Sequence, residues 1–230
     1  MVEGERIARE IPREKLLECY VSEDFPFAGN VKDVFGYDVD PVTVSSAVFK
    51  KMSDTQSPQG ILCVCKQNDV SAEDFITAKK SGALRLLLLE GVQDPGNLGT
   101  MIRTAEGAGF DAVIADTDTV DVYNPKVTRS TMGSLFRVPV MYTADLAGAV
   151  DMLRDSSVKV YAAHLNATKS FDDERYGDRT AFLIGNEGNG LSDEITEKAD
   201  ELIRIPMKGQ LESLNAAVAA ALLMYAATPK

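Results

Sequence analysis

Apolar and polar positions alternate along the chain in a way that divides it into two parts. From residue 84 onward, short apolar runs are followed by longer amphipathic segments. The pattern predicts strands at 84–89, 112–115, 159–163, 182–184 and 201–205, and helices at 98–108, 125–132, 144–154, 193–198 and 213–226. Such alternation is typical of an α/β domain whose mostly parallel sheet is covered on both faces.

The first 66 residues give a weaker pattern, which predicts a small α/β unit. Helices are expected at 5–10 and 46–52, and strands at 16–21 and 61–66. Residues 67–83 are rich in Asn, Asp, Ser and Lys and have weak periodicity, so a linker is expected there. The predicted domains are therefore 1–66 and 84–230.

Three strands of the second part run into loops rich in glycine and amides, each followed by a helix. These loops cover residues 94–99, 185–190 and 205–215. Because the carboxyl ends of parallel strands meet at one edge of a sheet, where open α/β proteins bind ligands, the loops predict one composite site.

The composition is that of an ordinary globular protein, with 45% hydrophobic residues. The run 84–89 is too short to span a bilayer and the first ten residues are too charged for a signal peptide, so we expect a cytoplasmic protein with no membrane contact. The chain has three cysteines, an odd number without the spacing of a disulfide framework, which fits a reducing compartment. Cys63 and Cys65 are interpreted as small buried hydrophobes, and no metal is expected.

The net charge of −11 argues against a globally basic nucleic-acid reader. Both parts of the chain are net negative, so a polyanionic partner would have to meet a local cluster of cations. The candidates for such a cluster are Lys126, Arg129, Arg137, Arg103 and Lys208.

Each polar residue of the three loops also has a plain structural interpretation. Asn97 and Ser213 could simply cap helices, and Arg103 could be a solvated charge. Asn215 is harder to explain by capping, since it falls within an apolar helix start, where a buried amide needs a partner. The glycines at 185–190 lack the downstream acid of a dinucleotide site, which disfavours a dehydrogenase. His164 is disfavoured as a general base, because its strand lacks a comparable loop.

Taken together, the three segments resemble the motifs of the SpoU (TrmH) family of RNA 2′-O-ribose methyltransferases in the SPOUT superfamily. Motif 1 corresponds to residues 94–103, motif 2 to 185–188 and motif 3 to 205–219, in the family's order. The resemblance implies a trefoil-knotted α/β domain, S-adenosyl-L-methionine as cofactor, and a homodimer formed through the Ala-rich last helix that completes the site. It implies cofactor contacts at Gly185, Ile205, Met207 and Leu214, and catalytic roles for Asn97, Arg103, Glu187, Ser213 and Asn215.

The resemblance also implies that the substrate is a structured RNA. Arg103 would clamp a phosphate and stabilise the developing alkoxide, because a guanidinium is a poor base at neutral pH. Glu187 would either accept the proton or pair with Arg103. The N-terminal part is similar to the family's small substrate-binding domain without its opening segment, and Ala217 stands where the family often has serine.

Ribosomal RNA is favoured as the substrate over tRNA because of this accessory domain. A SPOUT enzyme that methylates a base, and an RNA-binding protein that has lost catalysis, are the alternatives.

Overall fold

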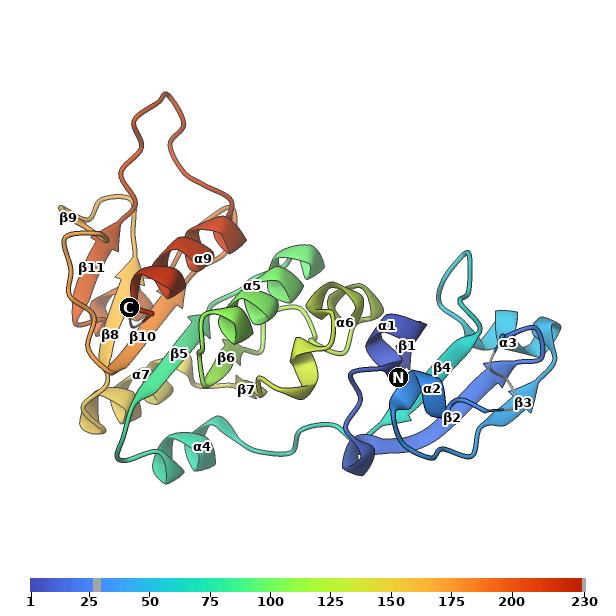
Figure 1. Cartoon of the computed structure of the whole chain (residues 1–230). Helices are drawn as coiled ribbons and strands as arrows, with labels where there is room; N and C mark the ends of the chain where they lie inside the picture. Colours follow the sequence, from blue (N-terminus) through green and yellow to red (C-terminus); the bar gives the residue numbers. More distant parts are fainter. Residues whose placement is uncertain (27–29, 229–230) are drawn as a thin grey trace.

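The computed structural model describes residues 1–26 and 30–228, whose strands form two separate sheets (Figure 1). The N-terminal sheet has the spatial order β1-β4-β2-β3. Its strands are β1 (Val2–Glu3), β2 (Leu16–Ser22), β3 (Val42–Val44) and β4 (Ile61–Cys65). Its helices are α1 (Glu5–Ala8), α2 (Lys32–Phe35) and α3 (Ser46–Met52). The prediction of a small α/β unit is confirmed.

The second sheet has the spatial order β7-β6-β5-β10-β8-β11-β9, and the pairings of these described strands are all parallel. Its strands are β5 (Leu84–Leu89), β6 (Ala112–Asp116), β7 (Val140–Thr143), β8 (Lys159–Ala163), β9 (Lys169–Ser170), β10 (Arg179–Ile184) and β11 (Glu201–Arg204). Its helices are α4 (Ala72–Ala78), α5 (Pro95–Gly107), α6 (Pro125–Thr131), α7 (Leu146–Asp155), α8 (Asp193–Lys198) and α9 (Ala216–Ala226). The predicted parallel α/β sheet is confirmed.

Helices cover the second sheet on both faces, with α5 and α9 on one face and α4 and α7 on the other (Figure 1). Successive side chains of a strand point to opposite faces. Leu87 and Leu89 of β5 therefore pack in the core beneath α5 and α9, whereas Leu86 and Leu88 pack in the core against α4 and α7. This burial on both faces explains why residues 86–89 of β5 form an unbroken apolar run.

The segment 67–83, which the sequence pattern predicts to be a linker, contains the helix α4. The Ser71 hydroxyl caps the helix by accepting a hydrogen bond from the Asp74 N–H at 3.0 Å. Only Ala72 and Ile76 of α4 are fully buried, and both pack in the core with α7. Two buried positions in seven residues are too few for a periodic signal. Edge strand β7 was missed for a similar reason, since it spans only four residues.

The three cysteines lie in the N-terminal core. Cys19 and Cys63 are buried, and Cys65 is half-buried and packs against the same core. Burial raises the pKa of the Cys65 thiol to about 11, so the group is neutral at physiological pH. The interpretation of these cysteines as small hydrophobic residues is confirmed.

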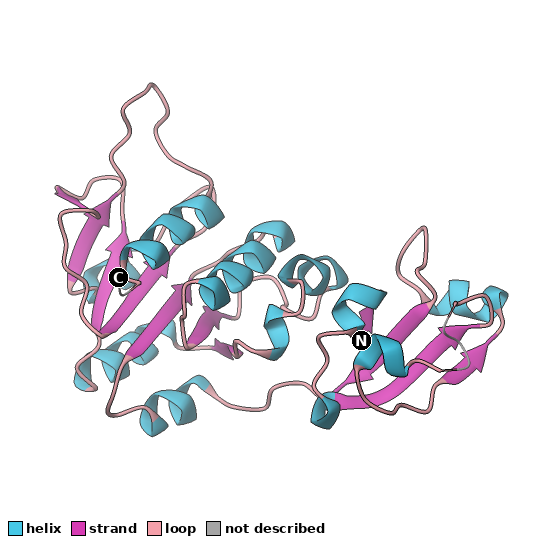
Figure 2. Cartoon of the chain, viewed as in Figure 1, coloured by secondary structure: helices cyan, strands magenta, loops and turns pink. Residues whose placement is uncertain are grey.

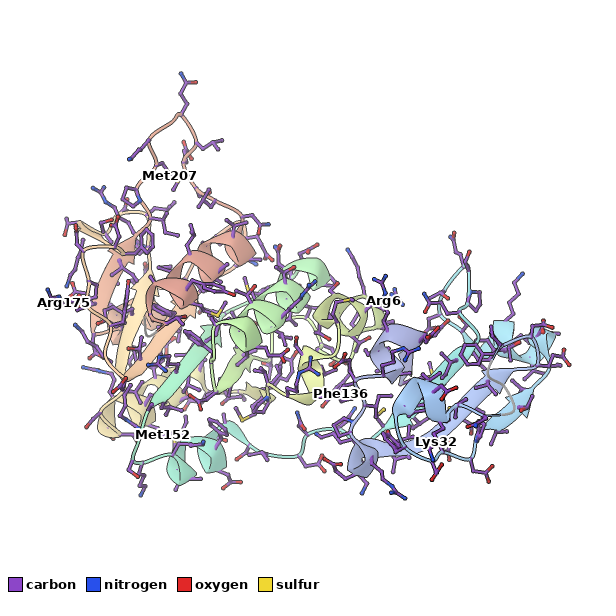
Figure 3. The ribbon with its side chains drawn as sticks, in the orientation of Figure 1. Arg6, Lys32, Phe136, Met152, Arg175 and Met207 are labelled. Carbon is purple, nitrogen blue, oxygen red and sulfur yellow. The ribbon has the colours of Figure 1, made fainter. Side chains whose placement is uncertain are left out.

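The two sheets are connected by packing as well as by the chain. Phe136, labelled in Figure 3, follows α6 and packs against the core of the N-terminal unit. Arg137 makes ion pairs with Glu10 of the N-terminal unit, at 2.6 Å, and with Glu106 of α5. The Tyr123 hydroxyl accepts a hydrogen bond from the Asn68 N–H at 3.1 Å.

Candidate active site

The three predicted loops meet at the carboxyl ends of β5, β10 and β11, where Glu187 joins two of them. One carboxylate oxygen of Glu187 accepts hydrogen bonds from the Asp94 N–H at 3.2 Å and from the Asn97 side-chain amide at 3.0 Å. The other oxygen accepts a hydrogen bond from the Gln93 N–H at 3.2 Å. Glu187 therefore ties the β10–α8 loop to the start of α5.

The third loop joins this network through Asn215. Its side-chain amide donates to the Asn97 side-chain oxygen at 3.0 Å. Its own side-chain oxygen accepts hydrogen bonds from the backbone N–H groups of Ala217 and Val218 at 3.0 and 3.3 Å. Glu187, Asn97 and Asn215 thus form one chain of hydrogen bonds, the loop network, that holds all three motif loops together.

The helix caps differ from the interpretation drawn from the sequence. Asp94, not Asn97, caps α5, because its carboxylate accepts the Asn97 N–H at 2.8 Å. Asn215, not Ser213, caps α9, which begins at Ala216 rather than at residue 213. The Asn97 side chain is therefore not used in capping and its amide donates to Glu187, whereas the Asn215 oxygen caps α9 and its amide group donates to Asn97.

Glu187 is held as a carboxylate. Burial by itself would raise its pKa, but the hydrogen bonds from Asn97 and from the backbone N–H groups of Gln93 and Asp94 outweigh that effect. The pKa of Glu187 is therefore lowered, since each of these donors favours the charged form.

The glycine-rich loop closes on itself through Asn186. Its side chain donates to the Gly91 carbonyl at 2.7 Å and accepts from the Gly188 and Asn189 N–H groups at 2.8 and 3.1 Å. A Cβ atom added to Gly185 would lie 2.2 Å from the Gly190 carbonyl carbon. The glycine at 185 is therefore required by the close approach of two backbone segments, and Asn186 is a loop-forming residue that the sequence reasoning missed.

A cavity of about 530 Å³ opens between the glycine-rich loop and the β11–α9 loop, within the usual range for small-molecule sites. The four residues predicted to contact a cofactor, together with Ser213, all line it. They are Gly185, Ile205, Met207 and Leu214. The small side chains of Ala216 and Ala219 leave room on the side formed by α9.

His164 also lines this cavity, although the sequence reasoning placed it outside the site. It follows β8, which pairs in parallel with β10, so its loop opens at the same edge of the sheet. The His164 Nδ1 accepts a hydrogen bond from the Asn166 N–H at 3.2 Å. Strand order was the missing signal, because the sequence alone does not show that β8 neighbours β10.

Two of the predicted catalytic residues lie outside the loop network. Arg103 is exposed on α5, six positions after Asn97, or about 9 Å along a helix axis at about 1.5 Å per residue. Within the part of the chain that the structure describes, it forms no ion pair with Glu187, whose carboxylate accepts from Asn97 instead. Ser213 is exposed on the β11–α9 loop, which projects from the body of the molecule (Figure 2).

Over residues 1–26 and 30–228, no three His, Cys, Asp or Glu side chains gather in a way that could hold a metal ion. None of the helices in that part of the chain has the length and apolar character needed to cross a membrane.

Comparison with known proteins identifies relatives that span most of the chain. The 23S rRNA (guanosine(2553)-2′-O)-methyltransferase RlmP of Bacillus subtilis is 42% identical over 182 residues, which are 79% of this chain and 70% of RlmP. The SpoU methyltransferase AviRb of Streptomyces viridochromogenes has the same fold, with a TM-score of 0.83 over 99% of this chain and 87% of that one, at 24% identity.

A third relative was solved with its cofactor. The AdoMet-bound rRNA methyltransferase of Sinorhizobium meliloti has a TM-score of 0.77 and 28% identity, over 92% of this chain and 79% of that one. The model of the SpoU rRNA methylase family matches residues 85–225, which include β5, the three motif loops and most of α9. The chain therefore belongs to the SpoU rRNA methylase family.

Proposed function

We propose that this chain transfers a methyl group from S-adenosyl-L-methionine to a ribose 2′-hydroxyl of structured RNA, with ribosomal RNA favoured over tRNA. The observation that carries the proposal is the loop network, which fixes three motif loops around one cavity. The name of RlmP supports guanosine 2′-O-methylation in 23S rRNA as the reaction type. The AdoMet-bound relative from S. meliloti supports the cofactor.

The cavity has the character that this cofactor requires. Ile205 and Leu214 offer apolar surface, and Gly185 together with the following loop offers backbone groups at the strand ends. We assign these three residues and Met207 to cofactor binding, largely through the backbone. The bound cofactor supplies a methyl group on a sulfonium that is reactive already, so the protein has to align the attacking hydroxyl and assist the loss of its proton.

The loop network has an anchoring role in this proposal. Hydrogen bonds that stabilise the carboxylate of Glu187 also make it a weaker base, so we assign Glu187 to holding the loops rather than to accepting the proton. Asn97 and Asn215 orient the loops through the hydrogen bond that the Asn215 amide donates to the Asn97 side-chain oxygen. Ser213, at the rim of the cavity, is assigned to the ribose or the cofactor.

Arg103 is assigned to the RNA. It is exposed and has no intrachain ion pair in the described part of the chain, so its guanidinium is free to bind a phosphate beside the reacting ribose. In that position it would also stabilise the developing alkoxide. Arg103 lies away from the cavity of its own chain along α5, so we propose that the site is shared between two copies and that Arg103 of one copy serves the cavity of the other.

A homodimer is therefore part of the proposal, formed through α9. Val218, Leu222 and Tyr225 recur at helical spacing and remain 49%, 39% and 58% exposed, which leaves an apolar stripe on the outer face of the helix. The buried face of α9 is already occupied by packing on α5 and β10. A second copy of the same stripe is the occupant that would cover it by two-fold symmetry.

Three further features complete the proposal. The knotted path implied by the resemblance would involve the β11–α9 loop and the return of α9 onto the sheet. The N-terminal unit, residues 1–66, would bind substrate RNA, and residues 84–230 would form the methyltransferase domain, with α4 of the connecting segment packed beneath it. Action on ribosomal RNA would place the protein in the cytoplasm.

The experiment that tests the proposal is methyl transfer from radiolabelled S-adenosylmethionine to unmodified ribosomal RNA and tRNA. The product linkage should resist alkali, because only a 2′-O-methyl group blocks cleavage there. Calorimetry should show binding of the cofactor or its demethylated product. Base methylation, or preferential binding of NAD, would overturn the proposal.

A further inference from the structure

Helix α6 spans the distance between the loop network and the N-terminal unit. At its start, the Lys126 ammonium lies 3.9 Å from the carboxylate of Asp94, whose backbone N–H donates to Glu187. Just beyond its end, a Cβ atom on Gly133 would lie 2.5 Å from the Cβ of Glu10. The strand β1 packs against α6 as well. The short helix is therefore one direct physical connection between the catalytic loops and the N-terminal unit.

The outer face of α6 carries two cations. Lys126 and Arg129 are exposed and lie three positions apart, whereas Val127, Thr128 and Thr131 point inward and are buried. The contact of Lys126 with Asp94 is long and both side chains are at least half exposed, so it neutralises little of the charge. Arg129 has no ion pair among the described residues.

A third cation lies on the N-terminal unit, at its junction with α6 (Figure 3). Arg6 of α1 is exposed, and it has no ion pair within the part of the chain that the structure describes. Figure 3 shows Arg6 at the junction between α6 and the N-terminal unit. In a chain with a net charge of −11, three neighbouring exposed cations that lack strong acidic partners form a local exception to the overall charge.

Arg137 has a different role from the one its charge indicates in the sequence. Its guanidinium is held between Glu10 and Glu106, and the hydrogen bond to Glu106 raises its pKa further. This pairing leaves little charge for RNA. Because Glu10 belongs to the N-terminal unit and Glu106 to α5, Arg137 instead fixes how the two units are oriented.

We infer that Lys126, Arg129 and Arg6 form one phosphate-binding surface, the α6 surface, which leads the backbone of the RNA substrate from the catalytic loops onto the N-terminal unit. Arg137 acts as a positioning residue that keeps Arg6 in line with α6. The inference rests on the proposed function for the identity of the ligand, since it assumes that an RNA enters the site beside Asp94.

The test is equilibrium binding of transcribed 23S ribosomal RNA at several salt concentrations, with Arg129→Ala, Arg6→Ala and the double variant. Each lost phosphate contact should lower the slope of log affinity against log salt by about 0.7–0.9 and weaken binding at low salt by roughly threefold or more. Arg175→Ala is the matched control, because Arg175 is also exposed but lies at the opposite end of the molecule (Figure 3). An unchanged slope in both single variants would refute the α6 surface.

Steady-state kinetics and removal of the Arg137 ion pairs provide two independent measurements. Arg129→Ala should raise the KM for RNA and leave kcat and cofactor affinity near the wild-type values. In an Arg137→Ala background, Arg6→Ala should no longer change the slope of log affinity against log salt, whereas Arg129→Ala should still lower it. If Arg137→Ala does not fold, Glu10→Gln repeats the test, because it spares the Arg137–Glu106 pair. If Arg6→Ala has the same effect on the salt slope in the wild-type and Arg137→Ala backgrounds, Arg137 is not a positioning residue. Failure of the wild-type protein to methylate any RNA would reject the proposed function. The salt dependence of RNA binding would still show whether the α6 surface binds phosphates.

Discussion

Replacement of Glu187 by glutamine tests whether the loop network holds the site together. The change keeps the shape of the side chain but removes its charge and turns one oxygen into an amide donor. If the remaining oxygen keeps its bonds to the Asp94 N–H and the Asn97 amide, the new NH₂ group faces the Gln93 N–H, where two donors oppose each other. One hydrogen bond is lost and two become neutral.

The magnitude follows from these three contacts. A hydrogen bond to a charged group contributes about 1.5–3 kcal/mol and a neutral one about 0.5–1.5 kcal/mol. Because Glu187 is exposed, solvent screens the difference, so we expect Glu187→Gln to lower the free energy of unfolding by about 1–2 kcal/mol at pH 7. For a chain of this size that corresponds to a Tm lowered by about 2–8 °C.

The pH dependence gives the measurement its sharpest form. The pKa of Glu187 is lowered in the folded protein relative to its ordinary value of 4.5. Its contribution is therefore present above that value and is lost as the pH falls through the folded pKa. Urea unfolding should show the largest difference between wild type and Glu187→Gln near neutral pH, and a smaller one in acid.

Glu194→Gln is the matched control, since Glu194 is exposed at the start of α8 and is not part of the loop network. Equal stability of wild type and Glu187→Gln at pH 7, or a difference that grows in acid, would refute the reasoning. Methyl transfer by Glu187→Gln should also fall, because the three motif loops would no longer be fixed around the cavity.

Three further predictions follow. Arg103→Ala should retain cofactor binding but lose at least roughly 100-fold in turnover, and lysine should rescue it only in part, because lysine keeps the charge but loses the planar fork. A near wild-type rate would show that Arg103 has no catalytic role. Sedimentation of the wild type should give about twice the chain mass of 24.9 kDa, whereas Tyr225→Arg should give a monomer with reduced activity. A fully active wild-type monomer would contradict the proposal that two copies of the chain share the site. Gly185→Ala should destabilise the protein by about 1–3 kcal/mol, because the new Cβ would lie 2.2 Å from the backbone of Gly190, and calorimetry should show weaker cofactor binding. Gly188→Ala is the control and should be tolerated, since a Cβ at Gly188 has its nearest contact at 3.4 Å.

Much of the second sheet was predictable, because its strands are buried on both faces and give strong apolar runs. Leu84–Leu89 is the clearest example, since each of its residues except Arg85 is fully buried. Ser192 likewise gave a correct helix start, as its hydroxyl accepts the Ile195 N–H. The helix α4, which has only two buried positions, and the strand β7, which has only four residues, were not predictable from the pattern.

The candidate site was predictable as a set of loops but not as a geometry. Motif spacing placed Asn97, Glu187 and Asn215 on three strand–loop–helix units, yet their mutual bonds depend on where each helix begins. Capping by Asp94 and Asn215 moves those starts by up to three residues from the predicted positions. His164 was missed because its place beside β10 depends on strand order, which is a tertiary property.

The loop network also bears on how the protein is made. The hydrogen bond between Glu187 and Asn97 joins residues 90 positions apart, and the bond between Asn97 and Asn215 joins residues 118 positions apart. Each of these contacts closes a long loop, whose entropic cost has to be met before the contact contributes, and non-local contacts of this kind slow folding. A nascent chain still being synthesised can assemble β5 and β10 before Asn215 leaves the ribosome, but it cannot close the site. Closure of the loop network therefore depends on motif 3, the last of the three motifs along the chain.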